Sequence, residues 1–451
     1  MQVIHADEAL LPDGWAADVT VRVESGRIVS VGQGGEGLRV GCLIPAPVNL
    51  HLHSFQRAMA GLTERRNPAG RDSFWTWRQL MFRFLDSLTP EEVEAIAAFA
   101  QVEALEAGFA AVAEFHYLHH RPDGAPYDDL AEMSGRICAA AETTGCGLTL
   151  LPVLYSHGGC DGRPLAVGQV RFGNAPDRFA RLWQEAGEAV AALPPDARLG
   201  VAPHSLRAVS REGLAAVRAL DPTGPIHMHL AEQVAEVEEV EAALGARPVD
   251  WLLDHHPVDG RWCLIHCTQM TPDETRRLAR SGAIAGLCPV TEANLGDGIF
   301  DGLRFRAEGG RFGVGSDSAI RISLAEELRQ FEYSQRLRDR GRAMLAEPGR
   351  STGRVLLEEA ARGGAQAAGR PSGAIATGLW ADLLALDTSH VDLEGRNGDA
   401  LLDSWIFAGD SRMVAEVWSA GRHVVTGGRH IARDPVERRY RQVMARLRGL
   451  L

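Results

Sequence analysis

Short apolar runs alternate with helical segments through most of the chain. Eight strand-like runs lie near residues 42–53, 108–117, 147–156, 198–205, 225–232, 262–267, 283–290 and 312–318. Helical stretches separate them, for example Pro90–Ala107, Arg178–Ala192 and Pro272–Ser281. Strands that alternate with helices indicate parallel βα units, and eight such units over roughly 320 residues predict a (β/α)8 TIM barrel of the α/β class.

The two ends of the chain have a different pattern. Residues 1 to about 45 alternate apolar and polar positions between glycine and aspartate residues, which is typical of β-hairpins. A similar pattern returns between Asp382 and Thr426. We therefore expect a small β-sandwich domain built from both chain ends. The expected domains are residues 1–45 with 370–434, the barrel over 46–369, and a C-terminal helix over 435–451.

Composition narrows the class of protein. Of the 451 residues, 45% are hydrophobic and 24% charged, with a net charge of -12, as expected for a globular protein that binds neither nucleic acid nor membrane. No apolar run approaches about 18 residues, the length of a membrane span. The seven cysteines form no CxxC pair, and the N-terminus lacks the basic and apolar segments of a signal peptide. These features predict a cytoplasmic protein with reduced thiols.

The sequence contains no lysine, so all 47 basic residues are arginine. A carboxylated lysine that bridges two metals, or a lysine that forms a Schiff base, is therefore excluded. The chain also lacks a GxGxxG loop after a strand and a GxSxG elbow, so neither a nucleotide site nor a serine triad is predicted.

Histidines and one aspartate stand at the ends of the strand-like runs. His51 and His53 are two residues apart, so a strand places both side chains on one face. His229 and Asp317 end the fifth and eighth runs. An HxH pair alone is weak evidence, but imidazoles and a carboxylate gathered at the active end of a barrel are suited to zinc or a similar divalent metal.

Two further residues fit a reaction beside that metal. Glu232 follows His229 by three residues and can reach a substrate; the alternative is a charge at a helix N-terminus. His266 ends the sixth run, where it can hold a water molecule. A zinc knuckle made with Cys263 and Cys267 is rejected because no second cysteine pair is present.

Other polar residues follow the second and fourth strands. Arg207 is placed to bind an anionic group through its planar guanidinium, and the alternative is a surface salt bridge. Tyr117 is placed to contact a substrate. The neighbouring His116, His119 and His120 are predicted to lie on the surface or at the rim of a pocket rather than to form a second metal site.

These motifs make the chain similar to the amidohydrolase superfamily, in its mononuclear deaminase branch. That branch has HxH on strand 1, HxxE on strand 5, His on strand 6 and Asp on strand 8, and the match covers nearly the whole chain. Within the branch the chain resembles the formimidoylglutamate deiminases of histidine breakdown. The supporting segments are residues 55–62, 72–78, 111–117, 150–157, 204–209 and 291–300. One departure is Leu52, where the family has a small polar residue; its side chain is expected to point away from the metal.

The resemblance implies hydrolysis of N-formimidoyl-L-glutamate to N-formyl-L-glutamate and ammonia. It implies one Zn²⁺, or another divalent metal, held by His51, His53, His229 and Asp317. It assigns catalysis to Glu232, His266 and Asp317, with proton transfer divided between the two carboxylates. It assigns substrate binding to Gln56, Arg78, Tyr117, His204 and Arg207. The small-molecule substrate is the expected partner, and a homodimer is implied.

Two alternatives remain at this point. A related deaminase that acts on a purine or pterin ring shares the metal site, but two arginines in the pocket favour a dicarboxylate. A non-catalytic relative that serves as a binding protein typically loses metal ligands, and this sequence keeps all of them.

Overall fold

The barrel is built from two runs of parallel strands in a computed structural model that describes residues 1–64 and 74–449. The strands are β5 (Val48–Leu52), β6 (Ala111–His116), β7 (Gly147–Leu154), β8 (Arg198–Leu199), β9 (Ala202–Pro203), β10 (Ile226–Leu230), β11 (Trp262–His266), β12 (Ile284–Leu287) and β13 (Arg311–Val314). Bridges between Val201 and Ile226 and between Leu52 and Asp317 join the two runs. The predicted (β/α)8 barrel is therefore confirmed.

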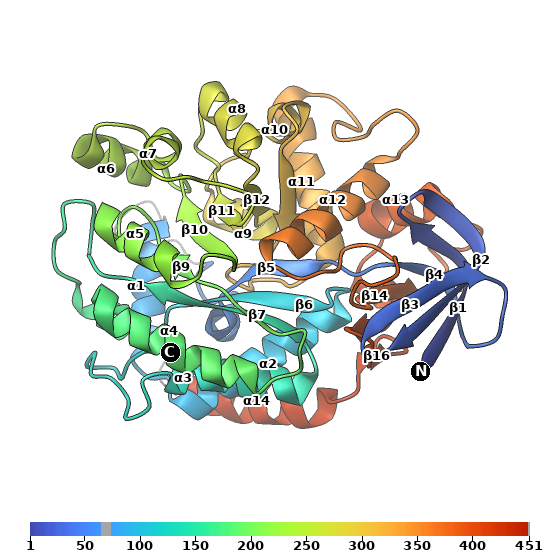
Figure 1. The fold of residues 1–451 in the computed structure, drawn as a ribbon, viewed down its shortest axis with the longest axis horizontal. Helices are drawn as coiled ribbons and strands as arrows, with labels where there is room; N and C mark the ends of the chain where they lie inside the picture. Colours follow the sequence, from blue (N-terminus) through green and yellow to red (C-terminus); the bar gives the residue numbers. More distant parts are fainter. Residues whose placement is uncertain (65–73, 450–451) are drawn as a thin grey trace.

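Helices follow the strands and cover the barrel (Figure 1). They are α1 (Phe74–Leu85), α2 (Pro90–Glu106), α3 (Glu132–Thr144), α4 (Pro176–Ala191), α5 (Arg211–Leu220), α6 (Val234–Leu244), α7 (Pro248–His255), α8 (Pro272–Ser281), α9 (Pro289–Leu295), α10 (Gly302–Ala307), α11 (Leu324–Asp339), α12 (Thr352–Ala367), α13 (Gly398–Ala408) and α14 (Arg433–Leu447). Short 3-10 helices are η1 (Ser54–Met59), η2 (Val167–Phe172) and η3 (Ser411–Met413). Local sequence fixes the start of α2, because Thr89 and Glu92 form a capping box and Pro90 begins the helix.

The first apolar run proves to be two strands rather than one. β4 ends at Pro45, and β5 begins at Val48. Pro45 and Pro47 each lack a backbone N–H, so the hydrogen-bond ladder is interrupted between β4 and β5. The chain passes from one sheet to the other at this point.

Strands from both chain ends form one mixed sheet with the order β17-β16-β15-β14-β4-β1-β2-β3. They are β1 (Gln2–Leu11), β2 (Gly14–Glu24), β3 (Arg27–Gln33), β4 (Leu38–Pro45), β14 (Leu383–Leu386), β15 (Val414–Ser419), β16 (Arg422–Thr426) and β17 (Arg429–His430). β4 and β14 pair antiparallel and join the two halves, which lie together at one side of Figure 1. The exact division into domains stays a prediction.

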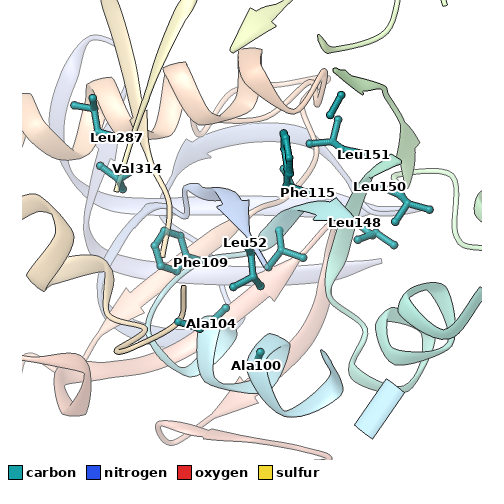
Figure 2. Close-up of a cluster of buried hydrophobic side chains, with 14 of the residues drawn as sticks. Leu52, Ala100, Ala104, Phe109, Phe115, Leu148, Leu150, Leu151, Leu287 and Val314 are labelled. Atoms are coloured by element: carbon teal, nitrogen blue, oxygen red, sulfur yellow. The ribbon is translucent and has the colours of Figure 1, made fainter. Parts of the chain in front are cut away.

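Apolar side chains fill the space between the strands and α2. Figure 2 shows Leu52, Phe109 and Phe115 in this buried cluster, with Ala100 and Ala104 on the facing side of α2. Leu52 thus lies in the apolar cluster, whereas the side chains of His51 and His53 approach Asp317 instead, in keeping with the period of two in a strand. Within residues 1–64 and 74–449, no helix has both the length and the apolar character needed to cross a membrane.

Candidate active site

Backbone hydrogen bonds between the first and last barrel strands bring the predicted metal-binding residues together. The Asp317 N–H donates to the His51 carbonyl at 2.9 Å, and the His53 N–H donates to the Asp317 carbonyl at 3.1 Å. Gly315 permits this approach, because a Cβ there would lie 2.6 Å from the His51 nitrogen. Asn49 and Ser316 add two side-chain hydrogen bonds between the same strands. Asp317 is thereby fixed beside the HxH pair.

Left-handed backbone conformations gather at these strand ends. Of the ten described non-glycine residues with positive φ, five lie beside the histidine cluster. They are Ala231, His266, Cys267, Asp317 and Ala319. Such conformations cost on the order of 1–3 kcal/mol each and are concentrated at functional sites. The backbone is therefore locally strained where it orients the side chains of this cluster.

Nitrogen and oxygen atoms converge on one small volume. His51 Nε2 lies 3.1 Å from His229 Nε2 and 3.4 Å from Asp317 Oδ1. His53 Nε2 lies 3.2 Å from the same Asp317 oxygen. Donor atoms of His51, His229, His266 and Asp317 all lie within 4.8 Å of one another. The structure thus brings together all five residues that were predicted for the metal and its water.

The histidine tautomers fit a cation at this point. His53 Nδ1 lies 3.0 Å from the Phe115 carbonyl, and His229 Nδ1 lies 3.3 Å from the His204 carbonyl. A carbonyl only accepts, so each Nδ1 carries the hydrogen and each Nε2 keeps a lone pair towards the cluster. Converging lone pairs and a carboxylate are the donor set of a divalent metal ion.

Burial and charge act on the same groups. Burial lowers the pKa of His51 to about 3 and lowers that of His229, so both imidazoles are neutral. Burial opposes the charge of Asp317, but the neighbouring His51 and His53 outweigh it and hold its pKa well below the usual range. Neutral imidazoles with an ionised carboxylate are the protonation states that metal binding needs.

His266 stands on the other side of Asp317. Its Nε2 lies 3.9 Å from Asp317 Oδ2 and 3.7 Å from Glu232 Oε1, and its Nδ1 lies 3.3 Å from Glu292 Oε1. Burial opposes its protonation, but the carboxylates, Glu232 foremost, raise its pKa. Burial raises the pKa of Glu232, which lies at the pocket wall.

The cluster forms one wall of a pocket at this end of the barrel. All of the predicted substrate-binding residues line it: Gln56, Arg78, Tyr117, His204 and Arg207. Burial and the charges of Arg207 and Arg78 lower the pKa of His204, so its imidazole is neutral. Burial and the nearby Arg207 also lower the pKa of Arg78. Two guanidinium groups therefore occupy the same pocket.

The Gln56 side chain is held by Tyr117. Gln56 Nε2 donates to the Tyr117 hydroxyl at 2.8 Å. Gln56 Oε1 is buried and has no hydrogen-bond partner among the described residues. The amide therefore offers one unused acceptor at the pocket wall.

The structure adds residues that the motifs did not single out. Tyr155 and Gln169 stand beside Arg78, and Glu236 accepts the Glu232 N–H at 3.0 Å. Tyr155 lies in the segment 150–157 that supported the family resemblance, but Gln169 comes from η2, which no strand pattern predicts.

The prediction for the histidine cluster after β6 is wrong. His116, His119 and His120 are buried, not on the surface or at a rim. The chain after β7 folds back over them. The Arg171 carbonyl accepts hydrogen bonds from the backbone N–H groups of His119 and His120. The His119 side chain hydrogen-bonds to the Val153 carbonyl, and the His120 side chain hydrogen-bonds to the Gly173 carbonyl. Such buried, hydrogen-bonded histidines support the fold.

Comparisons with known proteins agree with this geometry. The model of the amidohydrolase family matches residues 42–424, and that of the N-terminal domain of formimidoylglutamate deiminase HutF matches residues 1–36. The formimidoylglutamate deiminase of Pseudomonas aeruginosa is 48% identical over 99% of this chain and 100% of its own. The 5-methylthioadenosine/S-adenosylhomocysteine deaminase of Natronomonas pharaonis is 26% identical over 93% of this chain and 89% of its own.

Solved structures give the same result. The crystal structure of an amidohydrolase from Brucella melitensis is 50% identical and has a TM-score of 0.95, with 99% of this chain and 100% of that chain covered. Atrazine chlorohydrolase TrzN from Arthrobacter aurescens TC1, complexed with zinc, is 20% identical with a TM-score of 0.84 and 99% of each chain covered, a likeness of fold alone. The chain therefore belongs to the amidohydrolase family and, within it, to the formimidoylglutamate deiminases.

Proposed function

We propose that this chain hydrolyses N-formimidoyl-L-glutamate to N-formyl-L-glutamate and ammonia, a step of histidine degradation. The observation that carries the proposal is one pocket that holds both the His/Asp cluster and two arginines. The cluster is suited to cleaving a C–N bond with water, and the arginines are suited to a dicarboxylate.

The ligands of a single Zn²⁺ would be His51, His53, His229 and Asp317. The two oxygens of Asp317 support this choice over His266 as the fourth ligand. His51 and His53 approach Oδ1 at 3.4 and 3.2 Å, whereas His266 faces Oδ2 at 3.9 Å. When bound, the metal supplies a water molecule whose pKa is lowered towards about 7.

From the neutral formamidine, the reaction moves both protons of the attacking water to the terminal nitrogen, which leaves as ammonia. Asp317 accepts the proton of the attacking water through Oδ2, which faces away from the HxH pair. His266 holds the oxygen as the formamidine carbon becomes tetrahedral. Glu232, 3.7 Å from His266, delivers a proton to the terminal nitrogen. The second proton passes from the hydroxyl of the tetrahedral carbon to the same nitrogen through these two carboxylates. The C–N bond then breaks, ammonia leaves, and the carbon keeps the oxygen as a formyl group.

The rest of the pocket would hold the glutamate part. Its two carboxylates need charged donors, because burying an unpaired carboxylate is expensive. Arg207 and Arg78 supply two guanidinium groups, with Gln56, Tyr117 and His204 between them and the cluster. A purine or pterin deaminase gains nothing from two such groups, so this alternative is less well supported.

Product analysis tests the proposal. Purified protein loaded with Zn²⁺ is incubated with N-formimidoyl-L-glutamate, and we expect N-formylglutamate and ammonia in equal amounts. Formamide and glutamate would mean that the other C–N bond is cleaved. No turnover, together with deamination of a purine or pterin, would overturn the proposal in favour of a ring deaminase.

Arg207 gives a sharper test of the substrate class. Arg207→Met keeps much of the side-chain volume and removes the charged donors. We expect kcat/KM for N-formimidoyl-L-glutamate to fall roughly 10²-fold, as for the loss of a charge-assisted pair. An analogue that lacks the contacted carboxylate should lose far less. Equal losses on both compounds would mean that Arg207 supports the barrel instead.

The resemblance also implies a cytoplasmic homodimer. Both points stay predictions, and sedimentation of the purified protein tests the second. A single species at the mass of one chain, 48.7 kDa, would contradict it.

A further inference from the structure

Tyr155 stands directly after β7 and faces the pocket beside the two arginines. It is 2% exposed, and its ring packs 4.5 Å from that of His204. It lines the same pocket as Arg78 and Arg207. The sequence patterns assign no role to this residue, although it lies in the segment 150–157 that supports the family resemblance.

The hydroxyl of Tyr155 receives two hydrogen bonds. Gln169 Oε1 accepts the Ala166 N–H at 2.8 Å, which fixes the orientation of its amide. Gln169 Nε2 therefore donates to the Tyr155 oxygen at 2.7 Å. Arg78 Nη2 donates to the same oxygen at 2.8 Å, and a guanidinium has no acceptor to offer in return.

This arrangement leaves one hydrogen to be used. A phenol oxygen has two lone pairs, and both are taken by Gln169 and Arg78. The phenol hydrogen must therefore be donated to a third group, and none of the described residues accepts it. Two donors that act on the oxygen also polarise its O–H and make it a stronger donor.

We propose that Tyr155 donates this hydrogen to a carboxylate of the bound substrate and so helps to select a dicarboxylate. The inference deepens the proposed function and rests on it. An anion is the fitting acceptor, because the pocket around Tyr155 carries the two arginine charges and no metal-cluster ligand contacts its hydroxyl. η2 supplies Gln169 and keeps the hydroxyl aimed before the substrate arrives.

A double-mutant cycle separates direct donation from mere support of Arg78. Tyr155→Phe removes the hydroxyl and keeps the ring. We expect kcat/KM for N-formimidoyl-L-glutamate to fall roughly tenfold or more, chiefly through KM, as for a hydrogen bond to a charged group. The same change in an Arg78→Met background should cost a further loss of similar size. A Tyr155→Phe change that is silent in that background would overturn the proposal, since Tyr155 would then act only through Arg78.

Binding of glutarate keeps this test independent of turnover. Glutarate carries two carboxylates and no reacting carbon, so calorimetric titration measures the anion site alone. We expect Tyr155→Phe to weaken glutarate binding roughly tenfold, while Tyr333→Phe, on α11, leaves it unchanged. If the wild type binds glutarate but does not hydrolyse N-formimidoyl-L-glutamate, the proposed function fails and the role of Tyr155 stands. If turnover is normal and Tyr155→Phe changes neither measurement, the role of Tyr155 fails alone.

Gln169→Leu provides a second variant if Tyr155→Phe does not fold. It removes the donor that orients the hydroxyl and leaves Tyr155 and Arg78 in place. We expect a several-fold loss of glutarate affinity, smaller than for Tyr155→Phe, because the hydroxyl can then rotate away. Unchanged affinity in a folded Gln169→Leu protein would contradict the orientation that the proposal requires.

Discussion

A buried arginine joins the barrel to the sheet of the chain ends, and its removal is expected to be costly. Arg370 follows α12 and is 1% exposed. Its Nε and Nη2 donate to the two oxygens of Asp382 at 2.6 and 2.8 Å, just before β14. Its Nη1 donates to the Asp196 carbonyl at 2.8 Å, just before β8.

Arg370→Met leaves the Asp382 carboxylate buried, and among the described residues the Ala420 N–H is then its remaining hydrogen-bond donor. Three charge-assisted hydrogen bonds are lost, two to Asp382 and one to the Asp196 carbonyl, each contributing about 1.5–3 kcal/mol. Breaking a buried ion pair from one side costs about 3–5 kcal/mol. We therefore expect the free energy of unfolding to fall by about 4 kcal/mol, a large share of the roughly 5–15 kcal/mol of a typical protein.

Urea unfolding followed by tryptophan fluorescence measures this loss. Arg422→Met is the matched control. Asp196, the partner of Arg422, still has its ion pair with Arg370 in this variant, and the Arg422 side chain is 29% exposed. We expect a loss of about 1–2 kcal/mol there. Adding Asp382→Asn to Arg370→Met removes the stranded charge and should restore part of the stability. A loss below about 1 kcal/mol for Arg370→Met would refute the reasoning, since that is the scale of an exposed pair.

Three further outcomes are expected. His229→Ala should lower the bound metal, measured by mass spectrometry, and abolish turnover; full activity in a metal-depleted variant would defeat the proposed site. Glu232→Gln should keep the metal and lower kcat on the order of 10²-fold, whereas a parallel loss of metal would make Glu232 a ligand. Burial opposes the charge of Asp196, but hydrogen bonds from Arg422 outweigh it and lower its pKa. The stabilisation that Asp196 contributes is therefore fully present above about pH 3.9, its pKa in the unfolded chain. It is lost as the pH falls through the lower pKa of the folded protein. Urea midpoints measured against pH should drop there, and less so in Arg422→Met.

Sequence patterns located the cluster because every member stands at a strand end, and parallel strands of a barrel end on one face. The same rule placed Arg207 and Tyr117 at the pocket. The rule predicts neither the contact of Gln169 with Tyr155, which is made from η2, nor that of Arg370 with Asp196, which is 174 residues away in the sequence. Such contacts depend on how the connecting segments fold back over the barrel, and the periodicity of the sequence does not predict those paths.

The buried histidines after β6 illustrate the same limit. Polar residues beyond a strand end are usually exposed, so the expectation for His119 and His120 was physically reasonable. It failed because the segment before α4 covers them and Arg171 supplies backbone acceptors. Arg171 also donates through its side chain to the His120 carbonyl at 2.8 Å. A single loop thus converts a polar surface into a buried network that lies next to the substrate pocket.

Backbone contacts position the predicted metal-binding side chains. The hydrogen bonds between the His51 carbonyl and the Asp317 N–H, and between the Asp317 carbonyl and the His53 N–H, join peptide groups and involve no ligand atom. Asn49 adds two bonds to Ser316, and Gly315 leaves the room for this approach. These contacts hold Asp317 in its left-handed conformation, with φ of 44°. Backbone pairing offsets this strain and holds Asp317 beside the HxH pair through atoms that are not donors to a metal, which limits the free energy needed to order these side chains.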